Sequence, residues 1–368
     1  MNQLLLLGAG QGVFISFFLL THIRGNIKAN RLLAALILSF AFYIAVPVLY
    51  QTNPDDFSHL IGIAFIPIFL FGPLTYLYTI ELTATYNLNY KKWLHFLPGA
   101  LILLYFLPHY LSSSGEKIEF LNKIKAEGLP TNLVLIWGLA CIQIIIYNFL
   151  SIKMLKSYQA YLLENFSEIR FINLKWLVFF MYFNVFVWII YTVIFLINLK
   201  VEIDPFGVAD KLFNLMLVVF IYGISYNILM RPEIFSGVIK KVPSHENKYK
   251  KSAIKENEAK KILNTLKHFM QEKRPHLDPD ITLNDLSKQA GINDKYLSQV
   301  MNQLSGMNFY GFVNSYRVKE AQNLLKENPE ATMLAIAFDA GFKSKSTFND
   351  AFKKFAGMTP SEYKKTIK

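Results

Sequence analysis

Hydrophobic residues dominate the first 230 positions of the chain, where they form seven stretches of about 18 to 25 residues with uncharged central portions. A helix needs about 20 apolar residues to cross the roughly 30 Å of hydrocarbon in a membrane. The pattern therefore predicts seven membrane-spanning helices. They cover approximately residues 3–21, 32–50, 59–80, 93–110, 132–152, 174–198 and 212–230.

The pattern becomes polar and basic at Arg231. From there to about Lys261 it is typical of a solvated linker held near anionic lipid, which we favour over a phosphate-binding segment. Residues 256–273 place apolar side chains on one side, as an amphipathic helix does. This connecting helix either carries a signal from the membrane or simply packs against the next domain.

Charge separates the same parts of the chain. Of the net charge of +12, residues 1–230 hold +3 and residues 231–368 hold +9. Hydrophobic residues make up 53% of the chain, above the roughly 45–50% of soluble proteins. We therefore divide it into a seven-span membrane module (1–230), a basic juxtamembrane linker with its connecting helix (231–273) and a C-terminal domain (274–368).

The loops between the predicted spans alternate in charge. The first, third and fifth are basic, the second has no Lys or Arg, and the fourth and sixth mix bases with acids. Because basic loops stay in the cytoplasm, this predicts an external N-terminus and a cytoplasmic C-terminal domain. The stretch from Leu4 to Leu20 lacks a basic segment before it and a cleavage pattern after it, so we interpret it as a retained span.

What the sequence lacks argues against several classes of protein. No Asp, Glu, Lys or Arg lies near the middle of a span, and ion-coupled transporters usually need one. The single cysteine, Cys141, excludes an intrachain disulfide and a Cys-based zinc site. Neither half contains a set of residues suited to catalysis or a metal-ligand spacing. We predict no catalytic residue, no cofactor, no metal and no enzymatic activity.

The last ninety residues contain an internal repeat. At an offset of 50 residues, Leu286 matches Ile336 and Gly291 matches Gly341, and beyond the glycine the offset becomes 51. Further pairs are Ala290 with Ala340 at the first offset, and Leu297 with Phe348, Met301 with Phe352 and Gly306 with Gly357 at the second. The repeat predicts two similar units whose turns differ in length by one residue.

Each unit has the residue types of a helix-turn-helix. A threonine can cap the first helix, a small alanine lets the second helix approach, a glycine supplies a left-handed turn, and a short polar residue caps the second helix. These residues are Thr282, Ala290, Gly291 and Asn293 in the first unit, and Thr332, Ala340, Gly341 and Ser344 in the second, with Phe342 after the turn. Pro360 begins a further capped helix. A long amphipathic helix from about Phe309 to Lys326 joins the two units.

This region resembles a known family. The stretch LAIAFDAGFKSKSTFNDAFKKFAGMTPSEY, from Leu334 to Tyr363, is similar to the signature of AraC-type transcription regulators, and NSYRVKEAQNLL is similar to their connecting helix. The resemblance covers roughly residues 275 to 366. It implies two recognition helices placed in successive major-groove segments of DNA. Ala335 departs from the family, because many members have a capping Glu there, and Asp350 stands where members often have a basic or neutral residue.

The outward positions of the two recognition helices are the candidate DNA contacts. Gln and Asn suit adenine, and Lys suits guanine or phosphate. The candidates for base contact are Lys295, Ser298, Gln299, Asn302, Lys345, Ser346 and Asn349. The candidates for phosphate contact are Arg317, Lys343, Lys353 and Lys354. We expect Phe348, Phe352 and Phe355 to form a buried stripe.

Together these patterns predict an all-α protein, with a seven-helix transmembrane bundle followed by a cytoplasmic domain with two helix-turn-helix motifs. We interpret it as a regulator in the bacterial inner membrane that couples an unknown signal to gene expression. Its expected partners are double-stranded DNA, the lipid bilayer, RNA polymerase and a signal molecule, while a homodimer is left open. The alternative is a membrane transporter or enzyme whose helical regulatory domain does not bind DNA.

Overall fold

The computed structural model describes residues 1–22, 25–83, 90–170, 172–201, 208–230 and 254–367. Within these ranges the chain is helical, apart from connecting segments and one isolated β-bridge between Phe166 and Thr282. The all-α prediction is therefore confirmed for the described residues. The chain forms two compact units, one of residues 1–156 and 174–244 and one of residues 157–173 and 245–368, and each is described by itself.

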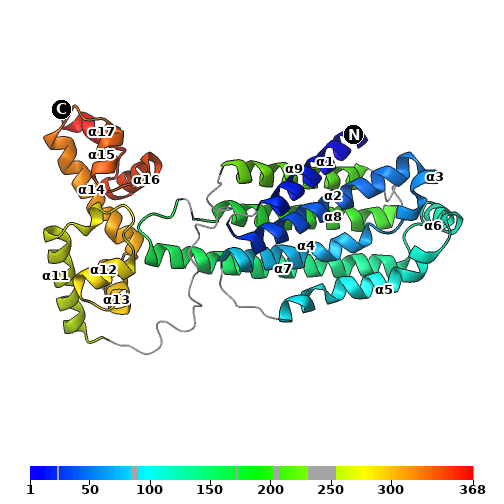
Figure 1. Cartoon of the computed structure of the whole chain (residues 1–368), viewed down its shortest axis with the longest axis horizontal. Helices are drawn as coiled ribbons and strands as arrows, with labels where there is room; N and C mark the ends of the chain where they lie inside the picture. Colours follow the sequence, from blue (N-terminus) through cyan, green and yellow to red (C-terminus); the bar gives the residue numbers. More distant parts are fainter. Residues whose placement is uncertain (23–24, 84–89, 171, 202–207, 231–253, 368) are drawn as a thin grey trace. The chain divides into compact units, whose positions relative to one another are not determined.

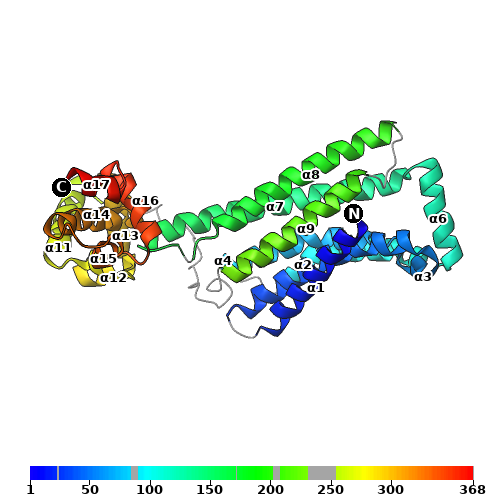
Figure 2. The same ribbon diagram turned by 90° about the horizontal axis from the view of Figure 1, so that it is seen from above.

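The N-terminal unit is built from long apolar helices, shown in blue to green in Figure 1 and from a second direction in Figure 2. Seven helices among the described residues have the length and apolarity to cross a membrane, and each overlaps one predicted span. The elements are α1 (Asn2–Thr21), α2 (Ile27–Thr52), α3 (Pro54–Phe57), η1 (Ser58–Leu60), α4 (Phe65–Thr83), η2 (Tyr90–Phe96), α5 (Leu97–Leu111), α6 (Ser114–Glu127), α7 (Thr131–Asn165), α8 (Lys175–Val201) and α9 (Val208–Met230).

Helix α2 lies at the centre of the N-terminal unit and packs against α1, α4 and α9. Close approach between α1 and α9 depends on Gly8, because a Cβ at this position would lie 2.4 Å from the Val218 side chain. Polar side chains inside the unit bond to nearby backbone, as Ser16 does to the Ala34 carbonyl at 3.1 Å. Small residues and local hydrogen bonds of this kind are what membrane helices use to associate.

The third and fifth predicted spans differ most in extent from the observed helices. The third was expected from residue 59, but α4 begins at Phe65, because Gly62 in the left-handed region (φ 85°) interrupts the helical path. The fifth was expected to end near residue 152, whereas α7 continues to Asn165. The apolar pattern stops near Lys153 while helix-forming residues continue, so the hydrophobic span is shorter than the helix. The predicted basic linker between Arg231 and Ala253, like Arg24 of the first loop, lies outside the described residues.

The C-terminal unit contains the end of α7 with the segment after it, and a set of shorter helices coloured yellow to red in Figure 1. These are α11 (Glu256–Glu272), η3 (Pro275–Leu277), α12 (Leu283–Ala290), α13 (Asp294–Ser305), α14 (Phe309–Glu327), α15 (Met333–Asp339), α16 (Lys345–Ala356) and α17 (Pro360–Thr366). Helix α11 coincides with the predicted connecting helix. It buries Ala259, Leu263, Leu266 and Met270 against α13.

Helix α14 joins two separate hydrophobic cores. Phe309, Phe312 and Val313 near its start belong to the core that α11, α12 and α13 complete. Val318, Ala321 and Leu325 further along belong to the core of α15 and α16. The domain therefore consists of two small helical units on one shared helix, as the repeat predicts.

Candidate nucleic-acid interface

The first helix-turn-helix is formed by α12 and α13. Thr282 and Asp285 form a reciprocal capping box at the start of α12, with the Asp285 amide donating to the Thr282 hydroxyl at 3.2 Å. Gly291 has a φ of 66° at the turn, and the Asn293 side chain accepts from the amide of Lys295 at the start of α13. Local sequence signals are sufficient for this geometry.

The second helix-turn-helix is formed by α15 and α16. Thr332 caps α15 without a reciprocal acid, as Ala335 implies, and Ser344 caps α16 by accepting from the Thr347 amide at 3.2 Å. Gly341 has a φ of 86°, and a Cβ there would lie 2.5 Å from the His276 carbonyl oxygen. The turn therefore needs glycine for two reasons, its left-handed backbone and its contact with η3.

The apolar positions of the repeat are buried in both units, with one difference at the turn. Ala340 and Phe342 are buried, as are Phe348 and Phe352, while Phe355 is partly buried. Pro360 is buried at the start of α17, which a Thr359 and Glu362 capping box begins. Ala290 is only partly buried, so the first unit has a looser contact at its turn.

Recognition helix α13 presents the predicted base-contact residues unequally. Lys295 is exposed, and Gln299 is half-buried and donates to the Gln303 side chain at 3.2 Å. Ser298 is only 5% exposed, and both Ser298 and Asn302 donate hydrogen bonds to the carboxylate of Glu164. Two of the four candidates on this helix thus already have an anionic partner.

Recognition helix α16 is open by comparison. The predicted base-contact residues Lys345, Ser346 and Asn349 are all exposed, as are the predicted phosphate contacts Lys353 and Lys354. Lys343 is exposed as well and forms an ion pair with Asp280. The exposed amide, hydroxyl and ammonium groups give this helix donors for base edges and for phosphate oxygens.

Arg317 was predicted to contact phosphate, and the structure corrects this interpretation. Its side chain is fully buried, with Nε donating to the His276 carbonyl at 2.8 Å and Nη2 to the Asp278 carbonyl at 2.8 Å. Nη2 also donates to the Ser167 hydroxyl at 3.1 Å. In a sequence, an arginine on an amphipathic helix is expected to be exposed. Here the guanidinium donates instead to backbone carbonyls that accept no helical hydrogen bond.

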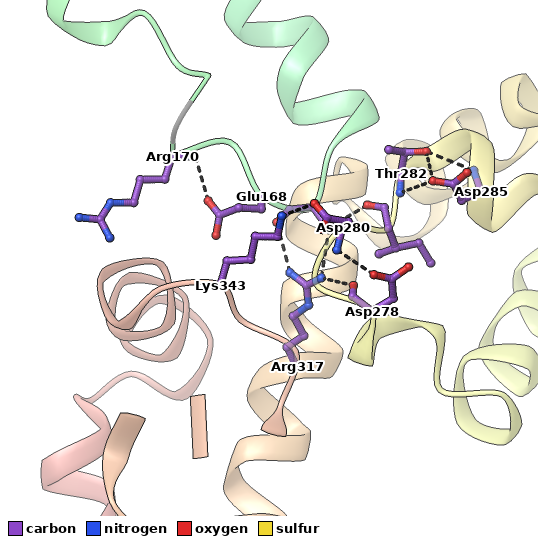
Figure 3. Close-up of polar contacts among 10 residues, drawn as sticks. Glu168, Arg170, Asp278, Asp280, Thr282, Asp285, Arg317 and Lys343 are labelled. Carbon is purple, nitrogen blue, oxygen red and sulfur yellow. Dashed lines mark hydrogen bonds and ion pairs between the residues drawn. The ribbon is translucent and has the colours of Figure 1, made fainter. Parts of the chain in front are cut away.

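Figure 3 shows how Arg317 lies beneath the turn that precedes α12, with Glu168 and Lys343 near it. Burial lowers the pKa of Arg317 to about 10, while the carboxylates of Glu168 and Asp278 act in the opposite direction. The guanidinium therefore keeps its charge at neutral pH. It also lies 5.7 Å from the ring centre of Phe342, a cation–π distance that links it to the second unit.

His276 is a buried titratable group close to this arginine. Burial lowers its pKa to about 4, Glu320 opposes this, and Arg274 and Arg317 add to it. Its Nδ1 atom is buried and has no hydrogen-bond partner among the described residues. The imidazole is therefore neutral at neutral pH and takes a structural position between η3 and α14.

Sequence reasoning missed three residues of this region, Glu164, Ser167 and Glu168. They lie in the loop that was interpreted only through its basic residues. Their polar character after the end of a span was the only available signal, and it is typical of any loop. Among the described residues no group of three or more His, Cys, Asp or Glu is placed to hold a metal ion.

Comparison with known proteins agrees with this geometry. Residues 286–366 match the family model described as a helix-turn-helix domain. Together with the two units on α14, the match defines the C-terminal part as a helix-turn-helix domain, of the kind found in AraC-type regulators. The solved structure of a protein of unknown function from Listeria innocua is 28% identical, covers 29% of this chain and 97% of its own, and has a TM-score of 0.25.

Three curated relatives can be named. The Msm operon regulatory protein of Streptococcus mutans is 25% identical over 171 residues, 44% of this chain and 58% of that protein. The melibiose operon regulatory protein of Escherichia coli is 28% identical over 88 residues, 24% of this chain and 29% of its own. An uncharacterised HTH-type transcriptional regulator of Staphylococcus aureus is 33% identical over 89 residues, 24% of this chain and 12% of its own. The chain thus spans less than two thirds of each.

Proposed function

We propose that this chain is a membrane-embedded, sequence-specific DNA-binding regulator that couples a signal in or outside the membrane to transcription. The observation that carries the proposal is the pair of helix-turn-helix units on α14, in a region that matches a helix-turn-helix family model. The named relatives regulate operons or transcription, which favours a regulator over an enzyme.

The surface of the N-terminal unit supports a bilayer as its surroundings. Large apolar side chains point outward on several of its helices, such as Leu7 at 71% exposed and Leu229 at 74%. In water, contiguous exposed apolar surface on this scale is rare. In the C-terminal unit the described large apolar side chains that are exposed are few, namely Tyr296, Leu304, Leu334 and Phe338.

The composition of the C-terminal unit supports the proposed topology. Residues 157–173, in the basic fifth loop, belong to the same compact unit as the DNA-binding domain. In this proposal the shared unit keeps the fifth loop and the C-terminal domain on the same side of the membrane, and the basic charge of the loop favours the cytoplasmic side for both. In this proposal double-stranded DNA and RNA polymerase are partners on that side, and the signal molecule is unidentified.

Helix α11 fits the packing interpretation better than a role as a free signal carrier. Its apolar face is buried in the first core, so it belongs to the DNA-binding domain. A signal from the membrane unit has another route, through the end of α7, which enters the same domain at residue 157.

The proposal is tested by a genomic footprint with the full chain in detergent micelles. We expect protected sites that share a sequence and that outcompete random DNA. Lys354→Ala should weaken binding to all DNA sequences alike. It should also lower the slope of log affinity against log salt concentration by about one unit, because one phosphate contact is lost. Lys267→Ala, at an exposed position on α11, is the matched control and should leave the slope unchanged. Binding without preference over random DNA would favour the alternative, a transporter or enzyme with a non-binding domain.

A further inference from the structure

Residues 157–173, here called the inserted segment, are built into the DNA-binding domain by their backbone. Ser167 is 1% exposed, and its hydroxyl donates to the Ile281 carbonyl at 2.7 Å. Arg317 Nη1 and the Asn314 amide each donate to the Ser167 carbonyl at 3.3 Å. The neighbouring Phe166 forms the antiparallel bridge with Thr282. The inserted segment is therefore held in the domain by buried hydrogen bonds from several of its elements.

The first recognition helix receives a carboxylate from the inserted segment. Glu164 Oε2 accepts from the Ser298 hydroxyl at 3.0 Å and from Asn302 Nδ2 at 3.0 Å, and Oε1 accepts from the same Asn302 nitrogen at 3.2 Å. Ser298 and Asn302 are four residues apart, so they lie on one face of α13. This is the face on which the sequence places base contacts.

The second recognition helix is contacted by the other acid of the inserted segment. Glu168 Oε1 accepts from the Thr347 hydroxyl at 3.3 Å, within the first turn of α16. The early residues of a recognition helix are those that approach base edges in helix-turn-helix complexes. Glu168 also adds negative charge beside Arg317, whose side chain is fully buried. Each recognition helix therefore has one glutamate of the inserted segment against it.

We propose that the inserted segment occupies the DNA-reading face in competition with DNA. This inference rests on the proposed function. Glu164 takes hydrogen bonds that base or phosphate oxygens would otherwise accept, and a carboxylate there repels a phosphate brought within the same few ångströms. The described arrangement is thus the weakly binding state, and tight binding to DNA requires release of the end of α7.

The competition makes α7 the link between membrane and DNA. Anything that draws the end of α7 away from α13 raises DNA affinity, and by thermodynamic reciprocity bound DNA favours the released position of α7 by the same factor. Among the helices that the structure describes, α7 is the one that starts in the N-terminal unit and continues into the C-terminal unit, to Asn165.

The test compares full chains in detergent micelles by fluorescence anisotropy, with a labelled 30-base-pair duplex taken from the footprint and a random duplex of equal length. Glu164→Ala should tighten binding to the footprint duplex by about tenfold, the equivalent of one hydrogen bond to a charged group. Glu164→Gln, which keeps an acceptor, should tighten it less. Because Ser167 is the anchor and stays intact, these variants are expected to fold.

The matched control is Glu258→Gln, which removes the same charge from an exposed position on α11. If Glu258→Gln and Glu164→Ala changed DNA affinity by the same amount, net charge alone would explain the effect, and the proposed competition would be overturned. Unchanged or weaker binding by Glu164→Ala would overturn it as well, while leaving the proposed function intact. Failure of every chain to bind either duplex would overturn both.

A second measurement uses a crosslink that holds the end of α7 against α13, so it does not depend on finding the signal that releases α7. Because Cys141 is the only cysteine, Cys141→Ala leaves a background in which Glu164→Cys and Asn302→Cys can be joined by a short, reducible thiol crosslinker. Crosslinked protein should lose DNA binding and regain it on reduction, and bound DNA should slow the crosslinking. Equal binding before and after reduction would overturn the proposal. The two single-cysteine chains serve as controls for labelling alone.

Discussion

The two helix-turn-helix units share a repeat but not their surroundings. In the first, Ser298 and Asn302 on the recognition helix bond to Glu164, whereas Lys345, Ser346 and Asn349 on the second are exposed. The turn glycine of the first, Gly291, faces open space, whereas Gly341 packs against the backbone of η3. A duplicated sequence therefore specifies two similar cores, while contacts from elsewhere in the chain engage predicted base-contact residues in the first unit and leave those of the second exposed.

The largest expected effect comes from the residue that both units share. Arg317→Ala should lower the free energy of unfolding of the C-terminal unit by about 3–5 kcal/mol, because several buried carbonyls lose a charged donor. Pulse proteolysis in urea, scored on C-terminal fragments of the full chain, measures this. If Arg317→Ala left stability unchanged but reduced the salt dependence of DNA binding, Arg317 would be a phosphate contact after all, contrary to the structure. Arg317→Lys should recover only part of the loss, because an ammonium cannot span these acceptors.

The turn glycines break the symmetry of the repeat directly. Gly291→Ala should cost about 1–2 kcal/mol, the penalty for a left-handed alanine with space around it. Gly341→Ala should cost about 3 kcal/mol or more, because its Cβ would also overlap the His276 carbonyl, 2.5 Å away. The same proteolysis assay compares them. Equal losses would mean that η3 yields to the new methyl group.

Base recognition should differ between the units until the inserted segment is displaced. Asn349→Ala should weaken specific binding by about 1–3 kcal/mol at one base position, in the natural chain and in a Glu164→Ala background alike. Gln299→Ala should weaken specific binding by the same amount as Asn349→Ala, but only in the Glu164→Ala background. Competition assays with single-base variants of the footprint duplex measure both. Equal losses of Gln299→Ala on specific and random DNA would remove its assignment to a base.

The smallest effect concerns pH. The pKa of His276 is about 4 in the folded protein and ordinarily 6.5, so between these values the unfolded chain binds a proton that the folded chain does not. Stability is therefore complete above pH 6.5 and falls as the pH is lowered towards 4. We expect a loss of about 1 kcal/mol by pH 5, after allowance for solvent screening. His276→Gln should flatten this part of the stability profile, and an unchanged profile would assign the acid sensitivity to other groups.

Local signals made much of the C-terminal domain predictable. Caps, turn glycines and apolar periodicity depend on neighbours a few residues away, and α11 and α14 were placed within one residue or two of their observed ends. The apolar length of the spans likewise located the seven long helices. Their ends were less certain, as α7 shows, because a helix can outlast its hydrophobic stretch.

The missed features all depend on contacts between distant parts of the chain. Burial of Arg317 requires Ser167, which lies 150 residues earlier, and no periodicity connects the two. In the sequence Glu164 and Glu168 look like ordinary acids of the predicted fifth loop, and only the fold brings α13 and α16 against them. An arginine or glutamate in such a pattern is most often solvated, so sequence reasoning favours the surface, whereas this fold buries Arg317 and half-buries Glu164 and Glu168.

The inserted segment also sets an order of events during biosynthesis. Glu164 and Ser298 are 134 residues apart, and a ribosome adds about 5–20 residues per second. The end of α7 therefore leaves the ribosome roughly 7 to 27 seconds before its binding site exists. During that interval the inserted segment has no DNA-binding domain to pack against, and its docking must later close the long stretch of chain between them. In a newly made chain the inserted segment can therefore occupy the DNA-reading face only when synthesis is nearly complete.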